Sequence, residues 1–116
     1  MNGNDIVIVS ATRTAIGKFG GQFATTSAIE LGTTVAKAAI QKANLSPEQI
    51  DTVIFGNVLQ AGLGQNPARQ VGLGAGLHHT STAVTINEVC GSGLKAIISA
   101  AQALRLGDAK IVLAGG

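Results

Sequence analysis

The chain has little of what several classes of protein require. Its 116 residues include one cysteine, two histidines, no tryptophan or tyrosine, three phenylalanines and two prolines. One cysteine excludes an internal disulfide framework, and a free thiol fits a reducing cytosol. With so few ligating side chains, no metal site is expected. The eight basic residues are scattered singly, without the clustering and aromatic interleaving that suit stacked bases, so nucleic-acid binding has little support.

Charged residues are also scarce. They make up 12% of the chain, about half the usual fraction of a soluble protein, whereas hydrophobic residues make up 46%. No apolar run approaches the roughly 20 residues of a membrane span, so we expect the sparsely charged surface to be covered by protein and not by lipid. No secretory or transit leader is recognisable at the N-terminus, which favours a cytoplasmic location. We therefore expect one α/β domain that belongs to a larger assembly.

The hydrophobic pattern predicts alternating strands and helices in the order β-α-β-α-β-α-β. Four strands are predicted, at residues 6–9, 52–55, 83–86 and 110–114. Residues 6–9 are a continuous β-branched run, which is typical of a strand buried on both faces. The alternation predicts a mostly parallel sheet with helices on both faces and right-handed crossovers.

Start and stop signals locate the helices. Ser27 and Glu30 have the spacing of a capping box, and Asn44 is a plausible left-handed stop for the helix that follows. Asn66 followed by Pro67 predicts a second helix start. A third helix is predicted after residue 90, because apolar residues recur there at helical spacing.

Cys90 stands between a predicted strand and this third helix. At a helix N-terminus, free amides and the positive end of the macrodipole favour the thiolate, which is the reactive form of cysteine. The same amides could hold a developing oxyanion. Gly91 and Gly93 suit a turn with unusual dihedral angles that leaves the backbone open to a ligand. The pattern predicts a catalytic nucleophile.

Two other interpretations of this segment stay open at this point. A free cysteine commonly packs as a small, inert, buried hydrophobe. Residues 91–96 also fit the relaxed dinucleotide pattern G-x-G-x-x-A, which follows a strand and opens a helix. That second interpretation requires an acidic residue at the end of the next strand to hold the ribose. Asp108 precedes that strand, so the dinucleotide pattern lacks its acid.

Four motifs occur in order along the chain and together resemble the thiolases. They are residues 9–17 (Val-Ser-Ala-Thr-Arg-Thr-Ala-Ile-Gly), 64–70 (Gly-Gln-Asn-Pro-Ala-Arg-Gln), 87–96 (Asn-Glu-Val-Cys-Gly-Ser-Gly-Leu-Lys-Ala) and 114–116 (Ala-Gly-Gly). The resemblance implies a thiolase-like fold and an acetyl-CoA C-acetyltransferase activity, which condenses two acetyl-CoA molecules to acetoacetyl-CoA and CoA and also catalyses the reverse thiolysis. Cys90 matches the acylated nucleophile of the family, and its amide would be one donor to the acyl oxyanion.

The resemblance also implies what the chain does not contain. Thiolases are more than three times as long, with two similar halves and an inserted loop domain, so residues 1–116 correspond to an incomplete N-terminal thiolase domain. The activating histidine, the second cysteine and most of the CoA-binding surface belong to the other portions. His78 and His79 match no catalytic motif and are expected to be a solvated pair. We therefore expect the isolated chain to be inactive and to need no cofactor, since coenzyme A enters as substrate.

Two alternatives to this function remain. One is another 3-ketoacyl-CoA thiolase or a related condensing enzyme, such as a ketoacyl synthase. The other is a non-catalytic association module. Because the family forms dimers and tetramers, a homo-oligomer is expected for the complete enzyme, and the isolated chain should associate through uncovered sheet edges and helix faces.

Overall fold

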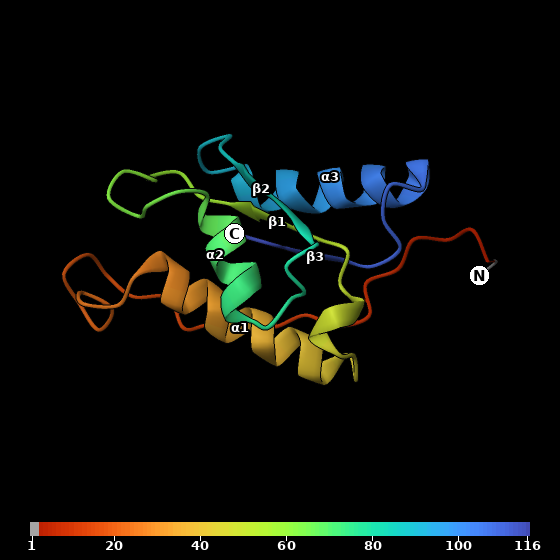
Figure 1. The fold of residues 1–116 in the computed structure, drawn as a ribbon. Helices are drawn as coiled ribbons and strands as arrows, with labels where there is room; N and C mark the ends of the chain where they lie inside the picture. Colours follow the sequence, from red (N-terminus) through yellow and green to blue (C-terminus); the bar gives the residue numbers. More distant parts are fainter. Residues whose placement is uncertain (1–2) are drawn as a thin grey trace.

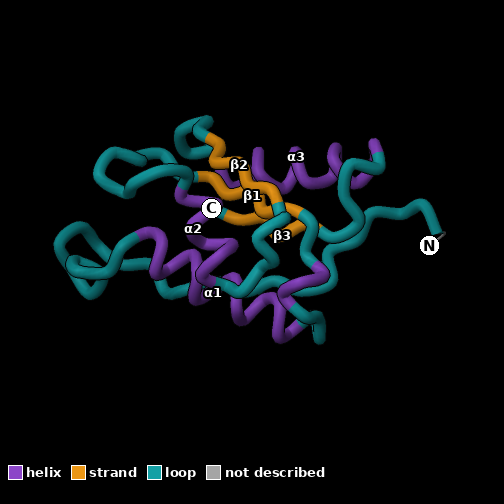
Figure 2. The backbone as a smooth tube through the Cα atoms, viewed as in Figure 1, coloured by secondary structure: helices purple, strands orange, loops and turns teal. Residues whose placement is uncertain are grey.

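The computed structural model describes residues 3–116, which form a parallel sheet between helices (Figures 1 and 2). The sheet has three strands in the order β2-β1-β3, with β1 (Thr52–Gly56) between β2 (Thr82–Ile86) and β3 (Val112–Gly115). Both neighbours run parallel to β1. The predicted α/β class and parallel sheet are confirmed.

Helices cover both faces of this sheet, as predicted. Helices α1 (Ala28–Lys42) and α2 (Pro67–Gly74) lie on one face, and α3 (Ser92–Leu106) lies on the other (Figure 1). A short 3-10 helix, η1 (Pro47–Gln49), leads from α1 towards β1.

The central strand places alternate side chains in two cores. Val53 and Phe55 pack with α1 and α2, whereas Ile54 packs against Ala96 and Ala100 of α3. This two-residue period is what a strand with two covered faces requires. Val53 is only 1% exposed, so β1 is the innermost element of the domain.

Local signals located the helix ends correctly. The Ser27 hydroxyl accepts a hydrogen bond from the Glu30 amide at 3.1 Å, and the Glu30 carboxylate accepts one from the Ser27 amide at 2.7 Å. Asn44 has a left-handed φ of 57° just after α1. Both features depend on residues within a few positions of each other, which is why the sequence reveals them.

The predicted first strand is wrong. Residues 6–9 are not part of the sheet, and the element order begins with α1. Val7, Ile8 and Val9 are 50%, 76% and 66% exposed, although a strand buried on both faces was expected. The β-branched run keeps an open, extended course without a strand partner among residues 3–116.

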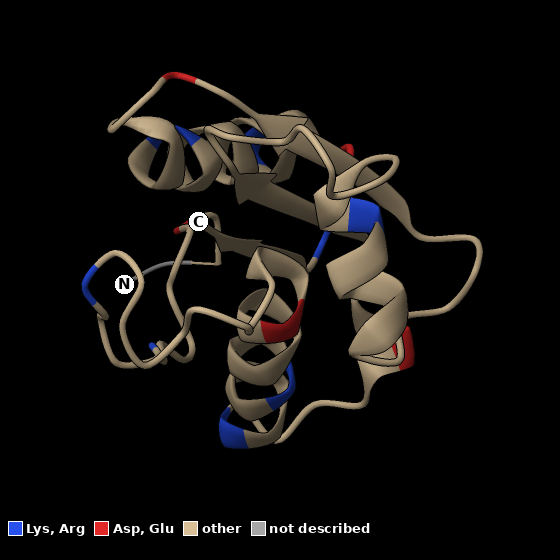
Figure 3. Cartoon of the chain, turned by 90° about the vertical axis from the view of Figure 1, so that its left-hand side faces the viewer, with Lys and Arg blue, Asp and Glu red and all other residues tan. Residues whose placement is uncertain are grey.

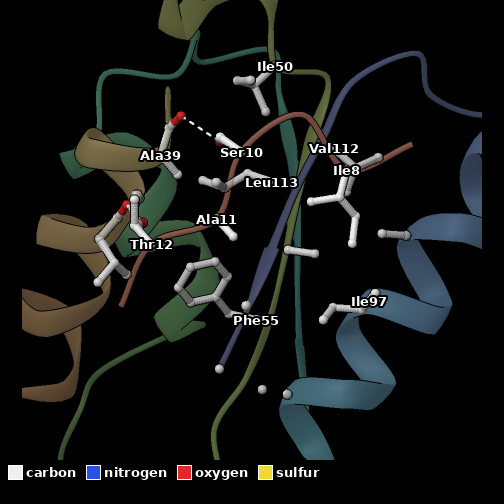
Figure 4. Close-up of a pocket in the computed structure, with 18 of the residues that line it drawn as sticks. Ile8, Ser10, Ala11, Thr12, Ala39, Ile50, Phe55, Ile97, Val112 and Leu113 are labelled. Carbon is white, nitrogen blue, oxygen red and sulfur yellow. Dashed lines mark hydrogen bonds between the residues drawn. The ribbon is translucent and has the colours of Figure 1, made fainter. Parts of the chain in front are cut away.

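The N-terminal segment is held by α1 instead. The Ser10 hydroxyl donates to the Ala39 carbonyl at 2.8 Å, and the Thr12 hydroxyl donates to the Val35 carbonyl at 2.9 Å. A cavity of about 1680 Å³ is lined by this segment, α1, α3 and β3 (Figure 4). Residues 6–9 line the same cavity as β3 but do not pair with it, so they form no ladder.

Asp51 ties the strands together at their amino ends. Its carboxylate accepts hydrogen bonds from the amides of Lys110 at 2.7 Å and Ile111 at 3.0 Å. Its own amide donates to the Ile111 carbonyl, and its carbonyl accepts from the Thr82 amide. The two backbone donors, Lys110 first, hold the pKa of the Asp51 carboxyl below its usual range.

Because of these hydrogen bonds of the Asp51 carboxylate, we expect the stability of the fold to decrease in acid. A carboxyl whose pKa is lower in the folded state stabilises the fold above its unfolded pKa of about 3.9, and that contribution is lost as the pH falls through the folded pKa. Because Asp51 is exposed, solvent screens the effect, and Asp51→Asn should lower the free energy of unfolding at pH 7 by only about 1 kcal/mol. Urea unfolding at pH 7 and pH 3 measures it.

The Asp51→Asn variant should lose less stability than the wild type between these two pH values. Glu30 acts in the same direction, because the Ser27 amide and hydroxyl lower its pKa, so some acid sensitivity should remain in the variant. Equal losses in the two proteins would show that Asp51 does not contribute to the acid sensitivity.

Lysine, arginine, aspartate and glutamate residues are scattered over the fold and do not gather in one region (Figure 3). Several large apolar side chains are exposed instead: Ile8, Ile16, Phe19, Leu59, Leu94 and Leu106. Within residues 3–116, no helix is both long and apolar enough to cross a membrane. The association expected from the sequence stays a prediction.

Candidate active site

The loops that follow the three strands lie at one edge of the sheet, because the carboxyl ends of parallel strands meet there. Asn57 follows β1, Asn87 begins the loop after β2, and Gly116 follows β3. The Asn57 amide donates to the Ile86 carbonyl at 2.9 Å, and the Asn87 side-chain amide donates to the Val58 carbonyl at 3.2 Å. Cys90 lies in the loop after β2, at the edge where parallel α/β sheets commonly carry their sites.

Glycines allow the start of α3 to sit directly against the strands. A Cβ added to Gly56 would lie 2.6–2.8 Å from atoms of Ser92 and Gly93, and one added to Gly116 would lie 2.9 Å from the Gly93 Cα. Neither position has room for a side chain. The first turn of α3 is therefore fixed against the ends of β1 and β3.

The residue before Cys90 has a strained backbone. Val89 has a φ of +52°, a left-handed conformation in which a β-branched residue is a genuine outlier. Such a conformation costs on the order of 1–3 kcal/mol and persists only where the surroundings enforce it. The Asn87 side-chain oxygen accepts a hydrogen bond from the Val89 amide at 2.9 Å, which supports the turn from the side of β2.

Ser92 supports the same turn from the helix side. Its side chain is buried, and its hydroxyl accepts from the Glu88 amide at 2.8 Å and donates to the Val89 carbonyl at 2.6 Å. Backbone bonds from the Gly91 amide to Glu88 and from the Ser92 amide to Val89, both 3.1 Å, close the turn. Residues 88–92 thus form a compact elbow.

Cys90 is at the outer side of this elbow, with a free and exposed thiol. Exposure excludes the buried, inert cysteine that the sequence left open. The helix is capped by Gly91 and begins at Ser92, so Cys90 lies two residues before the first helical position, slightly earlier than expected. No hydrogen bond to another described residue occupies the amides of Gly93 and Leu94, as is usual in a first helical turn.

One ion pair crosses the elbow. The Lys95 ammonium lies 3.9 Å from the Glu88 carboxylate, and both side chains are more than a third exposed. An exposed pair at this distance contributes little to stability, with a median of about 0–1 kcal/mol. The positive charge of Lys95 and the negative charge of Glu88 largely cancel, so the pair adds little net charge to the elbow.

The motif at residues 64–70 is structural. The Asn66 side-chain oxygen accepts from the Arg69 amide at 3.2 Å and from the Thr85 hydroxyl at 2.7 Å, which joins α2 to β2. The Arg69 guanidinium donates to the carbonyls of Ser81 at 2.7 Å and His79 at 2.9 Å. These side chains bind loop backbone, so the motif positions the elements around the site.

Asn66 should be intolerant of alanine. It combines an N-cap hydrogen bond with a left-handed φ of 48°. Asn66→Ala removes the cap, worth about 1 kcal/mol, and also removes the short polar side chain that lets asparagine tolerate the left-handed conformation, which adds roughly 1 kcal/mol. Asn66→Gly keeps the conformation and should cost about half as much. Chemical unfolding compares the two, and an alanine variant as stable as the glycine variant would contradict the conformational part.

The other candidate residues are not brought to this edge. His78 and His79 are exposed, stack with ring centroids 4.2 Å apart, and His78 Nδ1 lies 2.8 Å from the Thr80 hydroxyl. They are the solvated pair that was expected. Asp108 follows Gly107 at the far end of α3, so it cannot serve the dinucleotide pattern. In residues 3–116, no group of three or more potential metal ligands is present.

Sequence reasoning found Cys90 but missed its supports. Asn87 and Ser92 were noted only as members of the motif at residues 87–96, and no short sequence pattern predicts a left-handed conformation for Val89. The available signal was the tendency of asparagine to bond the backbone two residues ahead. The bonds of Ser92, by contrast, became evident only with the turn in place.

Comparison with known proteins shows which family the sequence matches. The family described as "Thiolase, N-terminal domain" matches residues 6–116. The chain is 60% identical over 112 residues to an acetyl-CoA acetyltransferase of Cupriavidus necator, covering 97% of this chain and 28% of that protein. It is 52% identical over 111 residues to the cytosolic acetyl-CoA acetyltransferase of Mus musculus, again covering 28% of it and 96% of this chain.

A solved structure shares the fold. The Acat5 thiolase from Ascaris suum, crystallised in complex with coenzyme A, superposes with a TM-score of 0.85 at 47% identity, covering 86% of this chain and 26% of that one. The thiolase-like architecture is thus confirmed. The chain spans little more than a quarter of the length of these relatives.

Proposed function

Because the chain belongs to the thiolase family, we propose that it supplies the nucleophile-bearing segment of an acetyl-CoA C-acetyltransferase. The single observation that carries the proposal is the exposed thiol of Cys90, presented by the strained elbow between β2 and α3. The names of relatives that are 60% identical support acetyl-CoA as the substrate.

The proposed reaction has two steps. The Cys90 thiolate attacks the carbonyl carbon of acetyl-CoA, and the CoA thiolate leaves, which stores the acetyl group as a thioester on the enzyme. A base then removes an α-proton from a second acetyl-CoA. The resulting enolate attacks the acetyl carbon, the Cys90 thiolate leaves, and acetoacetyl-CoA is released.

The chain's own contribution is to hold the nucleophile and to stabilise charge. The elbow fixes Cys90 before α3, and the free amides of the first helical turn provide donors of the kind that stabilise an oxyanion. We assign the base to the part of the enzyme that corresponds to the remaining length of the relatives. No cofactor is needed, because both reacting carbonyls arrive already activated as thioesters.

The proposal also covers the cellular location and the oligomeric state of the enzyme. We propose a cytoplasmic location, in line with the mouse relative named as cytosolic. We also propose that the exposed apolar surface is covered in a homo-oligomer, a dimer or tetramer, when the enzyme is complete.

A chimera tests the function. Residues 1–116 replace the corresponding segment of the Cupriavidus necator relative, which supplies the rest of the enzyme. We expect the chimera to gain one acetyl group on Cys90 after incubation with acetyl-CoA, measured by intact and peptide mass, and to cleave acetoacetyl-CoA when CoA is added. A folded chimera of native oligomeric size that neither acetylates nor cleaves would favour a non-catalytic association module. Cleavage of only longer ketoacyl-CoA substrates would favour another 3-ketoacyl-CoA thiolase.

A further inference from the structure

We infer that Ser92 is the positioning residue of the nucleophile: its hydroxyl holds Val89 in the left-handed conformation that presents Cys90 before α3. This inference rests on the proposed function of Cys90. It assigns no contact between Ser92 and substrate, since the Ser92 side chain is buried and Cys90 is exposed.

The two hydrogen bonds of the hydroxyl act on both sides of the strained residue. One anchors the amide of Glu88 at 2.8 Å, before Val89, and the other anchors the carbonyl of Val89 itself at 2.6 Å. A single hydroxyl therefore holds the peptide group before Glu88 and the one after Val89, so the backbone of these two residues is fixed at both ends. These two hydrogen bonds oppose a change of the Val89 φ angle towards the usual negative range.

Ser92 itself cannot move away. It is 4% exposed, and the Gly56 Cα approaches it so closely that a Cβ built there would lie 2.6 Å from the Ser92 carbonyl carbon and 2.7 Å from its Cβ. The sheet thus fixes Ser92, Ser92 fixes Val89, and Val89 sets the direction of Cys90. The chain of contacts runs from Gly56, at the carboxyl end of β1, to the thiol.

The Asn87 side chain contributes only part of this support. It accepts from the Val89 amide at 2.9 Å and reaches the loop after β1 through Val58, but Asn87 is exposed. Water can replace an exposed hydrogen bond, whereas a buried hydroxyl has no substitute. Ser92 is therefore the residue whose loss should release the elbow.

The test compares two reactions of the same thiol in the chimera. Alkylation by iodoacetamide requires only an accessible cysteine, whereas acetylation by acetyl-CoA requires an oriented one. We expect Ser92→Ala to lower the ratio of the acetylation rate to the alkylation rate at Cys90 at least tenfold. Ser92→Thr, which keeps the hydroxyl, should recover much of that ratio.

A matched control separates a general loss of stability from a loss of positioning at Cys90. Ala100→Gly also destabilises α3 at a buried position, two turns beyond Ser92 and away from the elbow. All variants are compared where circular dichroism shows them fully folded. Ala100→Gly should keep the wild-type ratio, and a loss equal to that of Ser92→Ala would reduce Ser92 to a structural residue.

The backbone of Val89 provides a second readout that does not depend on activity. Chemical shifts and the amide-to-α-proton coupling of Val89 report its φ, which should leave the left-handed region in Ser92→Ala. If the unsubstituted chimera is never acetylated, the proposed function fails, and the elbow then has no nucleophile to present. If it is acetylated while Ser92→Ala keeps both the ratio and the left-handed Val89, only the positioning inference is overturned.

Discussion

Replacing Cys90 with serine in the chimera is expected to lower the rate of acetoacetyl-CoA cleavage by about 10⁴-fold or more, the range typical for loss of a catalytic nucleophile. The hydroxyl is nearly isosteric, but it is not ionised at neutral pH and a serine ester is a poorer acyl donor than a thioester. Steady-state kinetics and intact mass after acetyl-CoA should agree, with no acetyl group retained by the variant.

A surface substitution provides the control for this experiment. His79→Gln alters an exposed side chain whose ring packs at a tilt against that of His78, and it should leave the rate within a factor of two. The Cys90→Ser variant must also keep the oligomeric size of the chimera. Retention of a tenth or more of the activity in Cys90→Ser would mean that another group accepts the acetyl.

Gly56→Ala is expected to be the most destabilising conservative substitution near the site. The new Cβ would lie 2.6–2.8 Å from the backbone of Ser92 and Gly93, distances that require the first turn of α3 to move. Overpacking of this kind typically costs about 1–3 kcal/mol. Urea unfolding of the 116-residue chain should show the loss, and acetylation of the chimera should fall as well, because the displaced turn carries Ser92.

Gly91→Ala is the matched comparison. Gly91 caps the same helix, but a Cβ there would meet only the Glu88 carbonyl, at 3.5 Å, and its φ of −84° suits any residue. This variant should therefore cost no more than about 1 kcal/mol, the size of a weakened helix cap. Equal stabilities for Gly56→Ala and Gly91→Ala would show that α3 is not fixed against β1.

The features that sequence alone predicted correctly depend on short distances along the chain. The capping box of Ser27 and Glu30 and the left-handed Asn44 are formed within a few residues, and a continuous apolar run marks β1 because its two faces are covered. The place of Cys90 between a strand and a helix is equally local. Periodicity and capping therefore sufficed for the fold class and the candidate nucleophile.

Residues 6–9 and the elbow were decided by tertiary structure. The β-branched run has the composition of a buried strand, but a strand needs a hydrogen-bonding neighbour, and among residues 3–116 the sheet offers these residues none. The left-handed Val89 and the bonds of Ser92 likewise require α3 to rest against the glycines of β1 and the segment after β3. Sequence thus determined which residue could react, because chemistry belongs to side chains, whereas packing between distant segments decided how that residue is presented.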